Sequence, residues 1–323
     1  MTLTERRILF DGPWLQIGHV AVRPTSSACG EIEVASHNVL ALPLAGVFAK
    51  HDGPRRQVFA TPQHALLIPA GQPYRLSFPG CIGDRCLVLR LGDEALERMF
   101  AELTGGRGLA ATDFAMHLPL PPALVLARGH LWQRLARGPA EVLEVEELGH
   151  HLLAGVLRAA RRHRLGAAGT GSRRAAPADA SGRRLRHVRQ AVELIAAQPQ
   201  ARWTLDELAG RANISVSHLA HSFRAELGLS VYDHVLRSRL ALALDAVLDS
   251  NAGLTDIALA AGFSSHSHFT ARFRALFGHT PAQLRRGVHR RTARQVQAMG
   301  ARIRAVPARP PPGEGPAPVC IGS

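Results

Sequence analysis

Two helix-length stretches of the sequence place hydroxyl, imidazole and guanidinium side chains between regularly spaced apolar residues. The first runs from Ser215 to Gly228, and the second, about fifty residues later, runs from Ser265 to Gly278. In both, the apolar residues recur at four-residue steps, which is the period of a helix that buries one face. Side chains on the opposite face can donate hydrogen bonds to base edges and phosphate oxygens. Their chemistry therefore indicates contact with a nucleic acid.

Boundary signals before the first stretch predict a helix, a short turn and a second helix. Thr204 and Glu207 have the spacing of a capping box, so we expect a helix from there to about Arg211. A turn at Ala212–Ile214 follows, and it leads into the second helix, which a glycine ends in the left-handed conformation. The segment is therefore predicted to be a helix-turn-helix unit.

The same pattern recurs later in the chain, so residues 184–291 are predicted to form seven helices that contain two like units. Asn in the first turn is acceptable opposite Gly in the second, because Asn tolerates positive φ. Between the units, Ser230–Asp249 is a long helical segment that can act as a shared strut, and Thr280-Pro281 starts the last helix. The matched pairs are Leu208-Ala209 with Ile257-Ala258, and Asn213-Ile214 with Gly262-Phe263.

The positive charge of the chain is concentrated in the same region. The formal net charge is +14, and residues 183–291 carry 15 Lys and Arg against 8 Asp and Glu, which is half of the excess. A basic module of this kind favours a polyanionic partner, and nucleic acid is favoured over an anionic membrane surface.

These stretches resemble the AraC/XylS family of transcription regulators. The resemblance covers about residues 185–287 and rests on LDELA, ISVSHLAHSFRAELG, RSRLALAL and IALAAGFSSHSHFTARFRALFGHTPAQLR. It implies two units on a rigid strut that enter two successive major-groove segments about 34 Å apart. The second helix of each unit would then contact the bases.

Candidate contact residues follow from the exposed early positions of the two second helices. At the position of Ala271 the family often has Arg, whereas this chain has Arg272, which a helix turns about 100° away. We therefore expect His and Ser to contact bases, and Arg to bind phosphates. The candidate base-reading residues are Val216, Ser217, Ala220, His221, His266, Ser267, His268 and Ala271. The candidate phosphate contacts are Arg224, Arg239, Ser265, Arg272 and Arg274.

The N-terminal half shows short apolar runs separated by Gly, Pro and Asp, which predict a small antiparallel barrel or sandwich. The pattern becomes helical at Ala95–Leu103, Pro122–Leu135 and Glu141–Arg164. Regulators of the family usually carry a cupin-like barrel with dimerising helices here. If the barrel has an effector pocket, its candidate wall residues are Phe48, His51, Tyr74 and Arg75. The predicted strands are Trp14–Val22, Glu31–Ala35, Asn38–Leu44, Gln57–Ala60, Ala65–Ile68 and Cys86–Leu91.

Several His and Cys residues of this half could suggest a metal site, but their spacing disfavours one. Metal-binding cupins usually carry an H-x-H pair and a P-x-G-x-x-H turn. In this chain Tyr74 occupies the last position of the turn, where the ligand histidine would be, and His37 has no second histidine two residues away. Cys81 and Cys86 lack the spacing and the second pair of a zinc site. We therefore predict no metal and no cofactor. The residues weighed as ligands were His37, His51, His64, Cys81 and Cys86.

The predicted fold is α+β with two domains: an N-terminal cupin-like antiparallel β-barrel with trailing helices, and a C-terminal all-α tandem helix-turn-helix domain. The sensor and dimerisation domain spans residues 1–164, and a Gly/Ala/Ser-rich flexible linker spans residues 165–184. The double helix-turn-helix domain spans residues 185–291, and a basic, Pro-rich disordered tail spans residues 292–323.

The resulting prediction is a cytoplasmic, sequence-specific DNA-binding transcription regulator that is not an enzyme. Its expected partners are promoter duplex DNA, RNA polymerase, a small-molecule effector and a second copy; no membrane is expected. The amphipathic 141–164 helix could pack on the barrel or on the second copy. Two alternatives stay open. One is a metal-dependent cupin enzyme fused to a DNA-binding domain, and the other is a non-specific basic DNA-binding protein.

Overall fold

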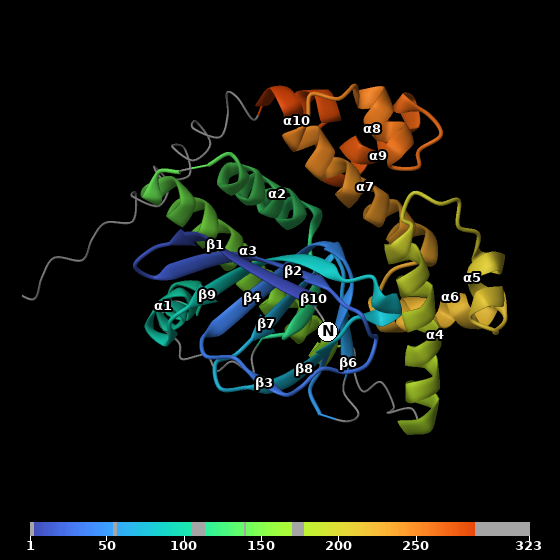
Figure 1. The fold of residues 1–323 in the computed structure, drawn as a ribbon, viewed down its shortest axis with the longest axis horizontal. Helices are drawn as coiled ribbons and strands as arrows, with labels where there is room; N and C mark the ends of the chain where they lie inside the picture. The colour runs from blue at the N-terminus through green and yellow to red at the C-terminus, as the bar shows by residue number, and fades with distance from the viewer. Residues whose placement is uncertain (1–2, 54–56, 105–113, 139, 170–177, 288–323) are drawn as a thin grey trace, which may run out of the picture.

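The computed structural model describes residues 3–53, 57–104, 114–138, 140–169 and 178–287, so the predicted tail at 292–323 lies outside the described residues. The N-terminal half consists of antiparallel sheets with covering helices, and the C-terminal half consists of helices (Figure 1). The predicted α+β fold class is confirmed. Among the described helices, none is long and apolar enough to cross a membrane.

Ten strands form two antiparallel sheets. Sheet A has the order β1-β2-β9-β4-β7-β10, and sheet B has the order β3-β8-β5-β6. The apolar pattern did not predict β1, β5, β8 and β10, because polar or charged residues interrupt these segments. The bounds are β1 (Leu3–Asp11), β2 (Leu15–Arg23), β3 (Glu33–Val34), β4 (Asn38–Gly46), β5 (Phe48–His51), β6 (Gln57–Ala60), β7 (His64–Ile68), β8 (Pro73–Ser77), β9 (Asp84–Leu91) and β10 (His117–Pro119). A short 3-10 helix, η1 (Pro79–Cys81), precedes β9.

The alternation of side chains along a strand gives sheet A two apolar faces. In β9, Leu87, Leu89 and Leu91 belong to the core that sheet A shares with the helices, whereas Cys86 belongs to the core between the sheets together with Phe48 of β5. A strand with both faces buried has a nearly continuous apolar run, as Cys86–Leu91 does.

Three helices, α1 (Asp93–Thr104), α2 (Pro122–Ala136) and α3 (Val142–Gly169), pack on the outer face of sheet A. Helix α3 lies so close to β2 that a Cβ at Gly149 would overlap the Leu15 side chain. Its apolar residues Leu152 and Val156 are fully buried in the same core. Of the two expected partners of this apolar face, the barrel or a second copy, the structure shows the barrel, because sheet A and α2 bury it.

Seven helices make up the described C-terminal part, as predicted for this region. Helix α3 ends at Gly169 and α4 begins at Ala178, so helical residues occupy both ends of the segment predicted to be a linker; residues 170–177 lie outside the described residues. The helices are α4 (Ala178–Ala197), α5 (Leu205–Arg211), α6 (Val216–Leu227), α7 (Val231–Asp249), α8 (Leu254–Ala260), α9 (His266–Phe277) and α10 (Pro281–Gly287).

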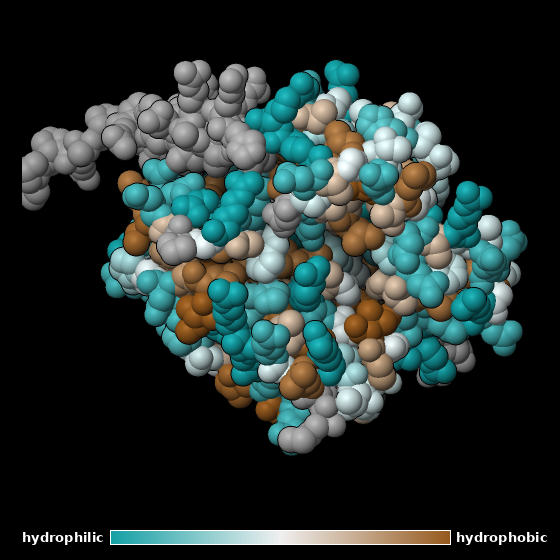
Figure 2. Space-filling view, turned by 45° about the horizontal axis from the view of Figure 1, so that its top comes forward, coloured by the Kyte–Doolittle hydropathy of each residue, from teal (hydrophilic) through white to brown (hydrophobic). Residues whose placement is uncertain are grey.

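Two separate apolar contacts join the halves. Helix α4 and the first helix-turn-helix unit share a core with the outer face of sheet B, where Val192 of α4 and Ala49 of β5 belong to one cluster. Helix α2 packs on α7 and α9, and a Cβ at Gly129 would lie 3.1 Å from Leu248 Cδ1. On the outer face drawn in Figure 2, the hydrophobic side chains form separate patches among hydrophilic ones.

Buried polar side chains reinforce both contacts. Gln63, before β7, donates from Nε2 to the backbone oxygen of His234 at 3.1 Å and to Ser238 Oγ at 2.9 Å, both on α7. On α2, Gln133 donates to the backbone oxygen of Leu248 near the end of α7. The buried Arg128 donates to the carbonyl oxygens of Pro43 and Pro62 within the N-terminal half.

Candidate nucleic-acid interface

The first helix-turn-helix unit has the local structure that its sequence predicts. Thr204 caps α5 in a capping box with Glu207, and Asn213 in the following turn has φ +55°. The Ser215 hydroxyl accepts a hydrogen bond from the backbone N–H of His218 at 3.3 Å, which caps α6. These caps satisfy N–H groups that a helix terminus leaves without partners, so they fix where α6 begins.

The second unit repeats this arrangement with one difference in the turn. Ser265 accepts a hydrogen bond from the backbone N–H of His268 at 3.2 Å and caps α9. Gly262 has φ +85°, and a Cβ there would overlap the backbone oxygen of Gln200, in the loop between α4 and α5. This turn therefore needs glycine both for its backbone conformation and for the close approach of the other loop.

The apolar residues of the two second helices form the cores of the units. Leu219 and Phe223 of α6, and Phe269 and Phe273 of α9, are fully buried. The rings of Phe269 and Phe273 lie 5.4 Å apart in an edge arrangement. Burying this face turns the remaining side chains of α6 and α9 outward.

Several predicted base-reading residues lie on those outward faces. Ser217 and His221 of α6 are exposed, as are His266, Ser267 and Ala271 of α9. The positions therefore share the first turns and the solvent-facing sides of two capped helices. Such a helix can present its first turns to the major groove of DNA.

The other predicted base-reading residues are partly buried. Val216, Ala220 and His268 are intermediate in exposure. The His268 ring lies 5.6 Å from the Phe263 ring, and its Nε2 accepts a hydrogen bond from Arg272 Nε at 3.4 Å. His268 thus packs partly on the core of its own unit, and it is less available to a base than His266.

Comparison with known proteins places these helices in a family. A family model described as a helix-turn-helix domain matches residues 208–287. The HTH-type transcriptional regulator MtrA of Neisseria gonorrhoeae is 29% identical over 107 residues, which are 32% of this chain and 34% of that protein. A putative AraC-like transcription regulator of Streptomyces lividans is 33% identical over 88 residues, which are 27% of this chain and 29% of that protein. The C-terminal domain is an AraC-type helix-turn-helix domain.

The two curated relatives named above match only about a third of this chain or less. The matches span about a third of the length of these curated relatives. A solved structure of a transcriptional regulator with an AraC-type DNA-binding domain, from Chromobacterium violaceum, is 28% identical with a TM-score of 0.31, and the match covers 32% of this chain and 94% of that one.

The candidate phosphate contacts of the AraC-type domain separate into free and engaged side chains. Arg224 and Arg274 are exposed and make no ion pair among the described residues. Arg239 instead points inward, and it donates to the backbone oxygens of Pro199 at 2.9 Å and Ala201 at 2.7 Å. Its burial lowers the pKa of the guanidinium. Arg239 therefore holds the loop between α4 and α5, a role that sequence spacing could not reveal.

Two further candidates are also engaged within the domain. Ser265 is the α9 cap described above, and Arg272 lies over the ring of Tyr232 at 6.0 Å from its centroid. Tyr232 is 58% exposed beside this arginine, and it is not among the residues predicted to contact DNA. An exposed aromatic residue at the start of the strut was the available signal, since such a ring can pack against a phosphate-binding guanidinium.

The four predicted effector residues have different surroundings in the two sheets. Phe48 is buried between the sheets, whereas His51 Nε2 lies 2.8 Å from Ser77 Oγ, and burial lowers the pKa of this histidine. The Tyr74 hydroxyl donates to Glu33 Oε2 at 3.1 Å, and Arg75 is exposed. Successive residues of a strand face opposite sides, so neighbours in the sequence such as Tyr74 and Arg75 are separated.

A buried ion pair between the sheets was not predicted. Lys50 is 2% exposed, forms an ion pair with Asp52, and lies 5.8 Å from the centroid of the Tyr74 ring. A buried ammonium group needs a charged partner, and Asp52 supplies it. The sequence signal was a lysine inside the short apolar run that forms β5.

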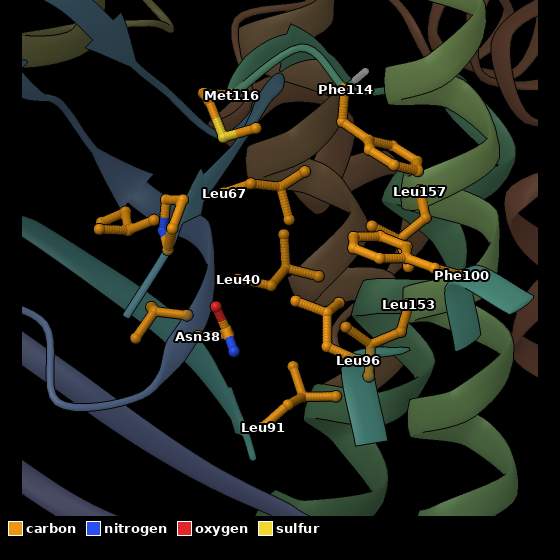
Figure 3. A pocket seen from close by; sticks show the side chains of 13 residues that line it. Asn38, Leu40, Leu67, Leu91, Leu96, Phe100, Phe114, Met116, Leu153 and Leu157 are labelled. Carbon is orange, nitrogen blue, oxygen red and sulfur yellow. The ribbon is translucent and has the colours of Figure 1, made fainter. Parts of the chain in front are cut away.

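The cavity in Figure 3 lies between sheet A and helices α1 and α3, away from all four predicted effector residues. Leu40, Leu67 and Leu91 of the sheet face Phe100 of α1 and Leu157 of α3 across it. Its volume is about 40 Å³, much smaller than the roughly 150 Å³ of an apolar cavity that takes up benzene. It is therefore a small void in the core, with too little room for a typical effector.

The amide of Asn38 closes one side of this cavity. It donates to Asp93 Oδ1 at 2.7 Å and accepts from the backbone N–H of Ala70 at 3.1 Å, so it stabilises the wall of the cavity.

The His and Cys residues weighed as metal ligands have other neighbours. His37 Nδ1 lies 2.9 Å from Ser36 Oγ, and His64 stacks on His117 with 4.8 Å between ring centroids. In the described part of the chain, no three His, Cys, Asp or Glu side chains are placed to hold a metal ion.

Proposed function

We propose that this chain is a sequence-specific transcription regulator that binds promoter duplex DNA through both helix-turn-helix units of its AraC-type domain. The observation that carries the proposal is the duplicated capped helix: α6 and α9 start at Ser215 and Ser265, and each presents exposed polar side chains in its first turns. Two such helices on the shared strut α7 suit two successive major-groove segments.

The exposed residues suggest how recognition is divided. Ser217, His221, His266 and Ser267 can donate or accept hydrogen bonds at base edges, while Arg224 and Arg274 neutralise phosphates. A protein with this division binds any DNA by charge and prefers the sequence that its hydrogen bonds fit. The non-specific basic protein is the competing reading, because it needs only the charge.

The remaining partners follow from the proposed function. A regulator of promoters acts in the bacterial cytoplasm and works with RNA polymerase, and a second copy would double the contacts over two half-sites. We assign the response to a small-molecule effector to the N-terminal half, whose two sheets and α2 contact both helix-turn-helix units.

A binding assay with the promoter DNA beside the gene tests the proposal. The full chain should bind this DNA more tightly than a scrambled duplex of equal length, and the preference should persist as salt weakens both complexes. Footprinting should show two protected segments about one helical turn apart. Equal affinity for promoter and scrambled DNA at every salt concentration would favour a non-specific basic protein instead.

A further inference from the structure

A seam between the two helix-turn-helix units runs along one face of α7, the helix that connects them (Figure 1). On this face Arg239 donates to two backbone oxygens of the loop between α4 and α5. The same loop reaches the second unit, because a Cβ at Gly262 would overlap the backbone oxygen of Gln200. Tyr232 precedes Arg239 by seven residues, which is about two helical turns, so it lies on the same face of α7.

Tyr232 holds an arginine of α9 across this seam. The Cζ atom of Arg272 lies 6.0 Å from the centroid of the Tyr232 ring, within reach of cation–π attraction. Arg272 also donates from Nε to Nε2 of His268, one turn earlier on α9, at 3.4 Å. The guanidinium is therefore held from two sides, on the flank of α9 that faces the start of α7.

The polar ends of both side chains stay available to a ligand. Tyr232 is 58% exposed, and Arg272 is exposed as well. Within the described part of the chain, no hydrogen bond occupies the Tyr232 hydroxyl or the two terminal nitrogens of Arg272. The neighbouring carboxylate of Asp233 accepts from Ser230 Oγ at 2.7 Å in the cap of α7. A phenol hydroxyl and a guanidinium with free N–H groups are donors that suit a phosphate oxygen.

A second cation–aromatic pair of the AraC-type domain lacks this availability. The Arg211 Cζ lies 5.4 Å from the centroid of the Trp203 ring. The indole Nε1 of Trp203 donates to the backbone oxygen of Gln198 at 2.9 Å. Since an indole has no other donor, this ring supports the fold of the first unit, whereas the Tyr232 ring keeps its hydroxyl free.

The seam lies where DNA would pass between the two reading helices. If α6 and α9 occupy two successive major-groove segments, the stretch that faces the protein between them is a minor groove with a backbone on each side. Tyr232 begins the helix that follows α6, and Arg272 belongs to α9. Their donors are therefore placed for a phosphate of that intervening stretch.

We propose that Tyr232 and Arg272 together bind one backbone phosphate of the minor-groove stretch between the two major-groove segments. Arg272 donates from its terminal nitrogens and Tyr232 from its hydroxyl, while the Tyr232 ring orients the guanidinium. The proposal rests on the proposed function, because it needs α6 and α9 on one duplex. A phosphate held from both sides of the seam also fixes the spacing of the two reading helices.

Binding of the full chain to promoter duplexes, each with a single phosphate replaced by an uncharged methylphosphonate, tests this contact. One replacement between the two protected segments should weaken wild-type binding by about tenfold, because hydrogen bonds to a charged group are lost. Arg272→Ala should weaken binding to the unmodified duplex by about as much and lower the salt slope by about one. It should also no longer respond to that methylphosphonate.

Tyr232→Phe isolates the hydroxyl, because it keeps the ring beside Arg272. It should weaken binding to the unmodified duplex by about fivefold and leave the salt slope unchanged, since the lost donor carries no charge. Its response to the same methylphosphonate should be smaller than that of the wild type. Arg211→Ala removes the guanidinium of the other pair and is the matched control, which should keep the full response.

Two results would overturn the shared phosphate contact. One is an Arg272→Ala variant that keeps the full methylphosphonate response, and the other is a Tyr232→Phe variant that binds as the wild type does. If the wild type still prefers promoter over scrambled DNA in either case, the proposed function stands and only the contact at the seam is refuted. Equal binding of promoter and scrambled duplexes would refute the proposed function itself.

Discussion

The two helix-turn-helix units share one local design, and they differ in what surrounds them. The first unit shares its core with sheet B through α4, and a buried polar contact from Gln63 reaches α7 nearby. The second unit packs on α2, where Gly129 lets two helices approach closely. A duplicated motif can therefore keep its caps and its core while each copy packs on a different part of the chain.

Acidification should affect the support of the first unit most strongly. His64 and His234 are buried and His117 is half-buried near the contact between β7, β10 and α7, and loss of solvent lowers the pKa of each, to about 4 for His117 and His234. At the contact of α2 with the second unit one such group, His130, has its pKa lowered by burial and by His279.

The sign of the effect follows from these directions. A folded-state pKa below the usual 6.5 means that the unfolded chain binds protons first, so stability is complete above pH 6.5 and is lost as the pH falls towards 4. At pH 5 we expect the free energy of unfolding to fall by about 2 kcal/mol for each of His117 and His234. Urea unfolding between pH 7.5 and 5 measures the loss, and hydrogen exchange should show the N-terminal half of α7 opening before α9.

His117→Phe should flatten this pH profile by one imidazole's share, although it leaves the Phe59 carbonyl without its hydrogen bond and lowers stability at pH 7. His266→Phe makes the same substitution at an exposed histidine, and it is the control that should leave the pH profile unchanged. An unchanged free energy of unfolding from pH 7.5 to 5 would show that these histidines do not titrate with folding.

The turns of the two units should tolerate substitution very differently. Gly262→Ala should lower the free energy of unfolding by about 2–4 kcal/mol for two reasons. The alanine would have to adopt a positive φ, and its Cβ would lie 2.8 Å from the Cα of Gln200. Asn213→Gly, at the matching turn, should be nearly neutral. Thermal unfolding of the two variants measures the contrast.

Gly228→Ala separates the two costs at Gly262. Gly228 has φ +71° and open space around the position of a Cβ, so alanine there should cost about 1 kcal/mol from the backbone alone. If Gly262→Ala costs no more than Gly228→Ala, the close approach between the second turn and Gln200 does not hold the units together.

Local signals in the sequence predicted the AraC-type domain well, because caps, turns and helix periods are set by neighbours in the chain. The capping box at Thr204 and the left-handed Asn213 are examples, and both are confirmed. Roles set by distant partners could not be predicted. Arg239 binds carbonyl groups some forty residues away, and the partner of the apolar face of α3 depends on the sheet arrangement.

The effector residues stay a prediction, and the sequence alone could not place them on the strands for a related reason. Phe48, His51 and Tyr74 were grouped by residue type, but strand register decides which face each one occupies, and register depends on pairing across the sheet. The exposed β1 strand was missed because its charged residues hide the alternation. The boundaries of the domains stay predictions.

Base contacts should distinguish the two reading helices. His266→Ala should weaken binding to the cognate site by about 1–3 kcal/mol and flatten the preference at one base position in the segment contacted by α9. His221→Ala is the matched change on α6, and it should flatten a position in the other segment. Selection from randomised duplexes gives both profiles, and a loss of preference in the same segment for both variants would contradict the assignment of one helix to each segment.

The smallest expected effect separates an arginine that binds phosphate from one that holds the fold. Arg274 is exposed on α9, so Arg274→Ala should weaken cognate and random DNA about equally and lower the salt slope by about one, since one fewer counterion is released. Arg239→Ala should leave the salt slope unchanged, because its guanidinium is committed to Pro199 and Ala201. It should instead lower the free energy of unfolding by about 1–3 kcal/mol, because two carbonyl groups lose their charged donor. Titrations at several salt concentrations and urea unfolding of both variants decide the matter: a reduced slope with Arg239→Ala and none with Arg274→Ala would exchange the two roles.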